Sequence, residues 1–291
     1  MWIILPIVNG EDYLRALLPD LVNQTIETRM LILDQASNRE CSDYLQGLQD
    51  ESGRILVWRF DPALSLGAAW NVAMEFVASQ DEAGAWILNH DIRVRREMGD
   101  YLQHMQSRFD AYFVSGVGVT KKQFDAFNEL PAGDAHGRTP EIAEVVWDVP
   151  GECLSMGGPD FSCFVYTIKG WRKYPFAEIY YPAYCEDVDL HRRMMLGGDG
   201  QKILGINFPF YHVGSTTIRH SKRARKAHDA RHDEVLAAYK KKWGGPPNGE
   251  TFALAYDGII GDARPDTVHL HRPDVTTPAL FAVERKKWGG E

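Results

Sequence analysis

The sequence predicts an α/β fold with a mostly parallel central sheet flanked by helices and followed by a C-terminal extension. Short apolar runs alternate with helical patterns from the first residue to about residue 91. The runs end at polar residues such as Asn9 and Asp34, where a strand would stop. Alternation at this spacing is typical of βαβ units, whose strands lie parallel.

Each element is predicted from its own pattern. The first apolar run ends in the turn pair Asn9-Gly10, which indicates a buried strand. Leucines at helical spacing follow it. We expect strands at residues 3–8, 30–33, 55–60, 85–88, 161–168 and 203–210, and helices at residues 13–22, 41–49, 66–78, 186–196 and 219–242. Residues 120–159 mix Gly and Pro with polar residues, so we expect long loops there with at most short strands, and a loose tail from Gly244 onward.

Composition sets the broad class of protein. With 291 residues, 44% hydrophobic and 25% charged, the chain is long enough for one large domain, or one domain with an appendage. A net charge of −8 argues against broad binding to nucleic acid. The four cysteines show no metal-site or disulfide spacing, and no apolar stretch approaches about 20 residues. The apolar N-terminus lacks a positive region, so we expect a first strand rather than a signal peptide, and a cytoplasmic protein.

Polar residues collect at the predicted strand ends. Ligands of open α/β sheets bind at the carboxyl ends of the strands. Asn9, Asp34 and Asn89-His90-Asp91 all follow predicted strands, so they would lie along one edge. Asp34 there is either a turn residue or an acceptor for a nucleobase or ribose.

Two residues are candidates for a metal site. Asp91 follows a strand, where a carboxylate can hold a divalent cation and leave positions open for a diphosphate. The alternative is an ordinary turn aspartate. His212 follows the last predicted strand; a neutral imidazole there suits a Mn-like ion, or it serves as a structural hydrogen-bonding group.

Three carboxylates open the predicted helix at 186–196. Glu186, Asp187 and Asp189 either include a general base or simply favour the helix N-terminus. Asp189 can also pair with Arg193 four residues later.

Six short segments stand in an order that is informative as a set. They are Leu5-Pro6-Ile7-Val8-Asn9-Gly10, Leu33-Asp34-Gln35-Ala36-Ser37, Ser65-Leu66-Gly67-Ala68-Ala69-Trp70-Asn71, Leu88-Asn89-His90-Asp91, Pro175-Phe176-Ala177-Glu178 with Glu186-Asp187-Val188-Asp189-Leu190 and Arg193, and Tyr211-His212-Val213-Gly214-Ser215. Together they resemble glycosyltransferase family 2, especially its rhamnosyltransferase-like members, over residues 3–245.

The resemblance implies a GT-A fold with a Rossmann-like sheet. Residues 1–215 would form the catalytic domain, divided into a nucleotide-sugar-binding half at 1–119 and an acceptor half at 120–215. Residues 216–291 would add a basic helical segment and a tail. The implied reaction is inverting, metal-dependent transfer of a hexosyl or deoxyhexosyl group from a nucleotide-diphosphate sugar, with UDP or dTDP as the expected nucleotide, to an acceptor hydroxyl.

The resemblance also assigns roles to residues. Asp187, with Glu186 beside it, would be catalytic, and Asp91 and His212 would hold Mn²⁺ or Mg²⁺. The donor-binding residues would be Asn9, Asp34, Asn71, Asn89, His90, Gly158, Asp160 and Arg193. Three positions depart from the family pattern: Asn89 is not an acid, Gly10 replaces a larger side chain, and Ala177 replaces the Asp of the F-D-E segment.

Other functions stay open at this point. A nucleotidyltransferase would need a basic, Gly-rich loop after the first strand, where this chain has the acidic Asn9-Gly10-Glu11-Asp12. A non-catalytic nucleotide-sugar-binding module would not need the acids at 186–189. The acceptor could be a glycan, a lipid-linked sugar or a hydroxylated DNA base, with the basic stretch 219–228 binding DNA or forming a solvated helix face. Residues 241–245, Lys-Lys-Trp-Gly-Gly, recur at 286–290, which fits a helix end with a glycine cap.

Overall fold

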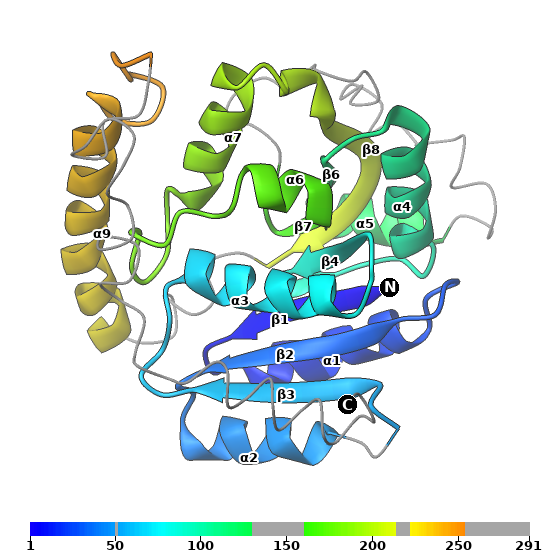
Figure 1. Cartoon of the computed structure of the whole chain (residues 1–291). Helices are drawn as coiled ribbons and strands as arrows, with labels where there is room; N and C mark the ends of the chain where they lie inside the picture. The colour runs from blue at the N-terminus through cyan, green and yellow to red at the C-terminus, as the bar shows by residue number, and fades with distance from the viewer. Residues whose placement is uncertain (50–51, 130–159, 214–221, 254–291) are drawn as a thin grey trace.

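A single mixed sheet forms the centre of the protein (Figure 1). The computed structural model describes residues 1–49, 52–129, 160–213 and 222–253. Within these residues the strands are ordered β3-β2-β1-β4-β7-β6-β8-β5. Their bounds are β1 Trp2–Ile7, β2 Arg29–Gln35, β3 Ile55–Phe60, β4 Gly84–Leu88, β5 Ile92–Arg93, β6 Phe113–Val119, β7 Cys163–Thr167 and β8 Ile203–His212.

The N-terminal half of the sheet is parallel, as the alternating pattern predicts. Strand β1 pairs in parallel with β2 and β4, and β2 with β3. Strand β7 runs antiparallel between β4 and β6. Strand β8 pairs in parallel with β6, and the short β5 pairs antiparallel with the end of β8. The sheet is mostly parallel, and the predicted fold class is confirmed.

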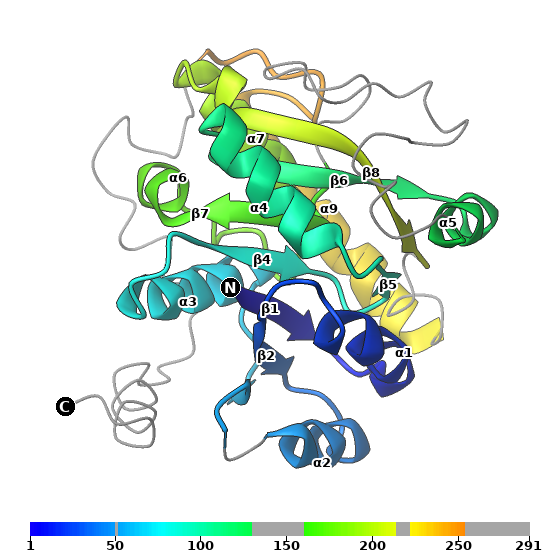
Figure 2. The ribbon, with the colours of Figure 1, turned by 90° about the vertical axis from the view of Figure 1, so that its right-hand side faces the viewer.

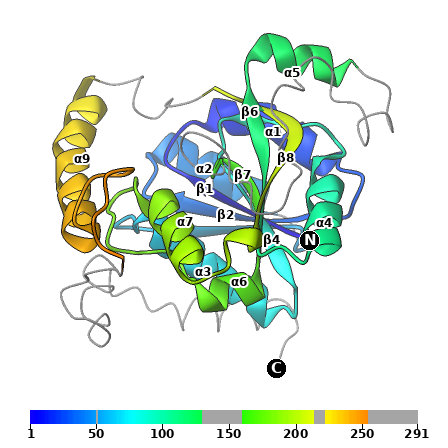
Figure 3. The same ribbon diagram turned by 90° about the horizontal axis from the view of Figure 1, so that it is seen from above.

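Helices cover both faces of the sheet (Figures 1, 2 and 3). They are α1 Glu11–Val22, α2 Arg39–Leu48, α3 Leu66–Ser79, α4 Met98–Phe109, α5 Lys121–Asn128, α6 Ile168–Lys173, α7 Glu186–Leu196 and α9 Lys222–Trp243, with a 3₁₀ turn at Gly200–Lys202. None of the helices in the described part of the chain is both long and apolar enough to cross a membrane.

Alternating side chains divide the core into two layers. On β1, Ile3 and Leu5 join the layer under α1, α2 and α4, whereas Trp2 and Ile4 join the layer under α3 and α7. This period of two is what a strand buried on both faces requires. The carboxyl ends of β1, β2 and β4 therefore meet at one edge, held by apolar layers on either side.

Three helices, α4, α5 and α6, and two strands, β5 and β6, were not expected from the sequence. Helix α4 and strand β6 lie between residues 92 and 119, for which no element was predicted. Helix α5 lies in the segment predicted to be loop, because Thr120 and Gln123 form a reciprocal N-terminal cap that starts it. The predictions for residues 130–159 lie outside the described residues. Cys41, Cys163 and Cys185 are free thiols.

Candidate active site

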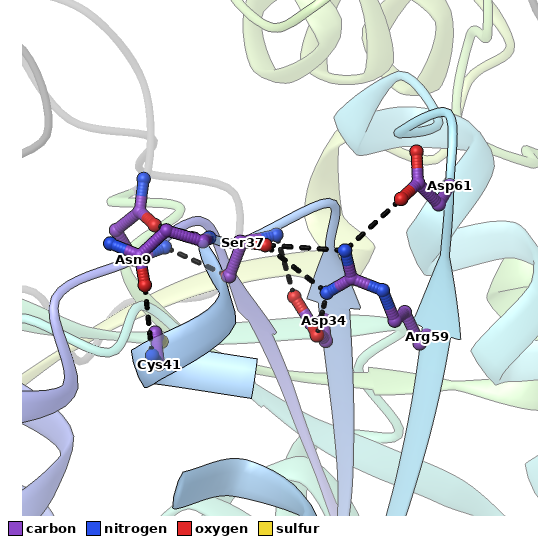
Figure 4. A network of polar contacts seen from close by, with 7 residues as sticks. Asn9, Asp34, Ser37, Cys41, Arg59 and Asp61 are labelled. Carbon is purple, nitrogen blue, oxygen red and sulfur yellow. Dashed lines mark hydrogen bonds and ion pairs between the residues drawn. The ribbon is translucent and has the colours of Figure 1, made fainter. Parts of the chain in front are cut away.

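The carboxyl ends of β1 and β2 are tied together by short polar contacts (Figure 4). The backbone N–H of Asn9 donates to Ser37 Oγ at 2.9 Å, and the N–H of Asn38 donates to Asn9 Oδ1 at 2.8 Å. The predicted donor residue Asn9 thus lies beside the loop that follows Asp34. Asn9 and Gly10 both have positive φ, which turns the chain sharply out of the strand.

Asp34 is buried and fully engaged within the protein. Its Oδ1 accepts from the Ser37 N–H at 2.9 Å, and its Oδ2 accepts from Arg59 at 2.6 Å. Burial alone would raise the pKa of Asp34, but the bonds from Ser37 and Arg59 outweigh it and hold the pKa below its usual value. Arg59 also donates to the Ser37 carbonyl and to Asp61 (Figure 4). Sequence reasoning missed Arg59, although it is the basic residue within an otherwise apolar strand.

Gly10 makes room for His90. A Cβ added at Gly10 would lie 2.7 Å from His90 Nε2, so a larger residue there would collide with the imidazole. Burial lowers the pKa of His90 and keeps the ring neutral. The neighbouring Asn89 donates its backbone N–H to the Ser162 carbonyl at 2.9 Å. The departure from the family pattern at Gly10 therefore accompanies a buried histidine that precedes Asp91.

Asp91 and His212 meet at the same edge. Residue Ile92 pairs with His212 in the sheet, and the Val213 N–H donates to the Asp91 carbonyl at 3.0 Å. His212 Nε2 lies 3.2 Å from Asp91 Oδ1, and Nδ1 lies 3.2 Å from Ser162 Oγ. Burial opposes protonation of His212, but Asp91 outweighs it and raises the pKa of the imidazole. Ser162, which the sequence patterns did not single out, orients the ring through the nitrogen that faces away from Asp91.

Asp160 acts electrostatically on both this pair and the acids of α7. Its Oδ1 accepts from the Ser162 N–H at 2.8 Å. Its Oδ2 lies 2.8 Å from where a Cβ of Gly118 would stand, so the glycine admits the carboxylate. The charge of Asp160 contributes to raising the pKa of both His212 and Asp187.

Glu186 and Asp187 open α7 as weakened acids. Burial, and then the charge of Asp187, raises the pKa of Glu186 to about 8. Glu186 Oε2 is buried and finds no hydrogen-bond partner among the described residues. Burial also raises the pKa of Asp187, whose Oδ1 accepts from the Val188 N–H at 2.7 Å. Both carboxyl groups therefore bind a proton more tightly than exposed acids do.

The third acid of the cluster has a different environment. Asp189 is fully buried, and Arg193 donates to its Oδ2 at 2.7 Å, which is the pairing predicted from their spacing. Arg193 also donates to the Pro175 carbonyl. Burial would raise the pKa of Asp189, but the charges of Lys242 and Arg193 outweigh it and hold the pKa well below its usual value. Asp189 thus remains ionised. Arg193 braces α7 in this structure, and a donor contact for it stays a prediction.

Asn71 joins α3 to α6 and to the segment that follows α6. Its amide donates to the Phe176 carbonyl and to Glu178, and its oxygen accepts from Trp171 and from the Phe176 N–H. These bonds use both the nitrogen and the oxygen of the carboxamide, so Asn71 holds α3 against residues 171–178. Its contact with the donor stays a prediction. A Cβ at Gly67 would overlap the carbonyl of Ala177, which explains why the two backbones can approach so closely.

Several predicted features lie outside the described residues. These are Gly158, the side chains of the basic stretch 219–228, and the second Lys-Lys-Trp-Gly-Gly segment. Backbone is described from Lys222, where the predicted basic helix is present as α9.

Comparison with known proteins agrees with this geometry. Residues 2–134 match the family model described as glycosyl transferase family 2. The match includes Asn9, Asp34 and Asp91 and ends before His212 and the acids of α7. Among curated protein sequences, none matches the chain.

Solved glycosyltransferase structures share the fold. Glucosyl-3-phosphoglycerate synthase from Mycobacterium tuberculosis, in complex with Mn²⁺, UDP and phosphoglyceric acid, aligns with a TM-score of 0.55 at 13% identity over 84% of this chain and 78% of that one. The mannosyltransferase PcManGT from Pyrobaculum calidifontis, in complex with GDP-Man and Mn²⁺, aligns with a TM-score of 0.53 at 13% identity over 98% of this chain and 79% of that one.

A third structure is S. aureus TarS 1-349 in complex with UDP-GlcNAc, with a TM-score of 0.51 and 13% identity over 81% of this chain. The present chain spans 66% of that TarS chain and 43% of the longer TarS chain. At these identities the likeness concerns the fold, which is that of GT-A glycosyltransferases.

Proposed function

Because residues 2–134 match the model of glycosyltransferase family 2, we propose that this chain is a member of that family and transfers a sugar from a nucleotide-diphosphate sugar to an acceptor hydroxyl with inversion. The observation that carries the proposal is the pairing of Asp91 with His212 beside the weakened acids Glu186 and Asp187, with Asp160 acting on both groups. A site for binding alone would not need two adjacent acids whose pKa is raised.

The residues at the edge fit a divalent cation. Asp91 Oδ1 and His212 Nε2 are 3.2 Å apart, and a carboxylate with a neutral imidazole suits Mn²⁺ or a similar ion. No group of three or more His, Cys, Asp and Glu side chains suited to a metal occurs in the part of the chain the structure describes, so diphosphate oxygens would complete the coordination. Such an ion would neutralise charge on the leaving diphosphate.

Asp187 is the proposed base. It takes the proton of the acceptor hydroxyl as that oxygen bonds to the anomeric carbon. The bond from this carbon to the phosphate oxygen breaks, and the nucleoside diphosphate leaves with the electron pair. Glu186 is the nearest alternative, since it lies next to Asp187 with a raised pKa, whereas the ion pairs of Asp189 keep it from accepting a proton.

The nucleoside is proposed to lie over the ends of β1 and β2. Asn9, Asn89 and His90 line this edge, and Asp34 would act there together with Arg59, its partner at 2.6 Å. Relatives with this fold are in complex with UDP-GlcNAc and GDP-Man. We keep UDP and dTDP as the expected nucleotides and a hexose or deoxyhexose as the sugar.

A thermal-shift panel tests the proposal. UDP-, dTDP-, GDP- and CDP-sugars are each added with and without Mn²⁺. A donor present at about 100 times its dissociation constant should stabilise the fold by about 2.7 kcal/mol. Radiolabelled transfer to water or to added acceptors then separates an enzyme from a binding module. Stabilisation by none of the nucleotide sugars, with or without the metal, would contradict the proposal.

A further inference from the structure

The C-terminal end of α9 is buried against the segment that leads into α7. Val235, Tyr239 and Trp243 of α9 form a separate apolar cluster with Tyr180. Ala177, Cys185 and Val188 pack against the same cluster. Helix α9 thus covers the stretch that ends at the two weakened acids, rather than standing apart as an appended helix.

Asp189 receives two further side chains from this helix end. Lys242 Nζ lies 2.7 Å and Trp243 Nε1 lies 2.9 Å from Asp189 Oδ1. Tyr180 donates to the same oxygen at 2.9 Å. Asp189 has no exposed surface and Lys242 is only 5% exposed. A buried charge pair persists only where hydrogen bonds and an opposite charge satisfy it, as they do here.

The chain beyond α9 closes back onto both helices. The N–H groups of Thr251 and Phe252 donate to the Trp243 carbonyl. Glu250 accepts from Tyr239 at 2.6 Å, and Arg192 of α7 donates to the Phe252 carbonyl at 2.7 Å. The end of α9 is therefore fastened from two sides to the first turns of α7.

We propose that Lys242 and Trp243 are positioning residues for the reaction, because they fix the first turn of α7 through Asp189 and so hold Asp187 at the metal-bearing edge of the sheet. This inference rests on the proposed function. The two residues touch neither donor nor acceptor; they act two positions away from the base. The first Lys-Lys-Trp-Gly-Gly segment is thus more than a capped helix end, although Gly244, with φ +74°, does cap α9.

Charge and placement act together in this arrangement. Asp189 contributes to raising the pKa of both Glu186 and Asp187, and Lys242 and Arg193 offset its charge. The charged groups that act on Asp187 are Asp160 and Asp189, and the charge of Asp187 in turn acts on Glu186. Without Lys242, the negative charge of Asp189 near Asp187 would be balanced by Arg193 alone. The first turn of α7, which carries Asp187, would also lose one of its contacts with α9.

The test compares two neighbouring lysines. Lys242→Met removes the buried ammonium group, whereas Lys241→Met, at an exposed position of the same segment, is the matched control. Misplacement of a catalytic group by about 1 Å costs about 10²-fold in rate, so we expect kcat to fall by about 10²-fold in Lys242→Met with the donor KM nearly unchanged. The acidic limb of the pH–rate profile should move to higher pH. Lys242→Arg should restore much of the rate, and Lys241→Met should resemble the parent protein.

Hydrogen exchange provides a readout that does not depend on activity. Amides of residues 186–190 should exchange faster in Lys242→Met and not in Lys241→Met. If Lys242→Met fails to fold because Asp189 has lost a buried cation, the double variant Lys242→Met/Asp189→Asn, which also removes the negative charge, is measured in its place. Unchanged exchange, or unchanged kcat and pH profile in a folded Lys242 variant, would overturn the inference and leave the proposed function standing. If exchange is faster in Lys242→Met but the parent protein transfers no sugar, the proposed function is overturned instead.

Discussion

Two groups of carboxylates lie near the edge of this sheet, and their pKa values are shifted in opposite directions. At the end of β2, the pKa of Asp34 is held below its usual value by Ser37 and Arg59. At the start of α7, burial raises the pKa of Asp187 and brings that of Glu186 to about 8. Asp34 and Glu186 are buried and Asp187 is partly buried, and burial raises the pKa of all three, so burial by itself does not explain the contrast.

The difference lies in the donors within reach. Asp34 has an arginine partner at 2.6 Å, whereas Glu186 and Asp187 have backbone N–H groups and like charges around them. Asp189, at the start of α7, resembles Asp34, because the positive charges of Lys242 and Arg193 balance its negative charge. Carboxylates with a cation contribute to structure, and those without one are suited to proton transfer.

The largest effect is expected from substitution of Asp187, the proposed base. Asp187→Asn keeps the shape of the side chain but cannot take a proton. We expect sugar transfer to fall by about 10²–10⁴-fold, the usual contribution of general base catalysis, with donor affinity nearly intact. Initial rates and calorimetric donor binding measure the two effects separately.

The other two acids serve as controls for this experiment. Glu186→Gln should retain more activity than Asp187→Asn. Asp189→Asn should lower stability and should reduce the rate less than Asp187→Asn, because Asp189 acts on the base only through the first turn of α7. Near-normal turnover in Asp187→Asn, with a collapse in Glu186→Gln, would move the base to Glu186 and still preserve the contrast between the two regions.

The next largest effect is expected from substitutions at the proposed metal site. Asp91→Ala and His212→Ala should each abolish most of the Mn²⁺ dependence of donor binding. Ser162→Ala removes only the contact to His212 Nδ1 at 3.2 Å, and partners of this kind contribute about 10-fold to metal affinity. Titration calorimetry with and without a chelator measures all three. Donor binding that ignores the chelator and both ligand substitutions would show that the edge holds no metal.

The sequence was informative where a chemical pattern repeats along the chain. Alternating apolar runs predicted the bounds of β3 and α7 to the residue, and the polar strand ends correctly indicated that Asp91 and His212 would meet. It was uninformative where a residue depends on a partner distant in sequence. Arg59 lies 25 residues from Asp34, and Lys242 lies 53 residues from Asp189. Nothing in the spacing of these residues distinguishes the compensated acids from the weakened ones.

A smaller effect is expected from removing the cation of the first region. Arg59→Met leaves Asp34 buried with hydrogen bonds from Ser37 and Ser42 but without a cation. A hydrogen bond to a charged group contributes about 2 kcal/mol, so the free energy of unfolding at neutral pH should fall by about that amount. Arg39→Met, at an exposed pair with Asp43, is the control and should change stability little.

The pH dependence of the Arg59 effect has a definite sign. The folded pKa of Asp34 lies below its unfolded value of about 3.9, so the stabilisation is present above that pH and is lost as pH falls through the folded pKa. The gap between parent and Arg59→Met should therefore be widest near neutrality and should narrow below about pH 4. Urea unfolding from pH 3 to pH 7 measures it, and a gap that widens in acid would contradict the ion-pair interpretation.

The smallest expected effect comes from a comparison of two glycines: Gly10, which follows β1, and Gly47, which lies within α2. Gly10 has φ +81° and lies against His90, so Gly10→Ala combines an unfavourable backbone with a steric collision. A left-handed alanine costs about 1–2 kcal/mol before the imidazole moves. Gly47, within α2, has open space around its Cβ position, and Gly47→Ala should stabilise the helix by about 1 kcal/mol. Thermal unfolding should shift in opposite directions for the two variants. Because His90 precedes Asp91, only Gly10→Ala should also weaken donor binding. Stabilisation by both alanines would mean that Gly10 and His90 adopt a looser arrangement than the contact at 2.7 Å implies.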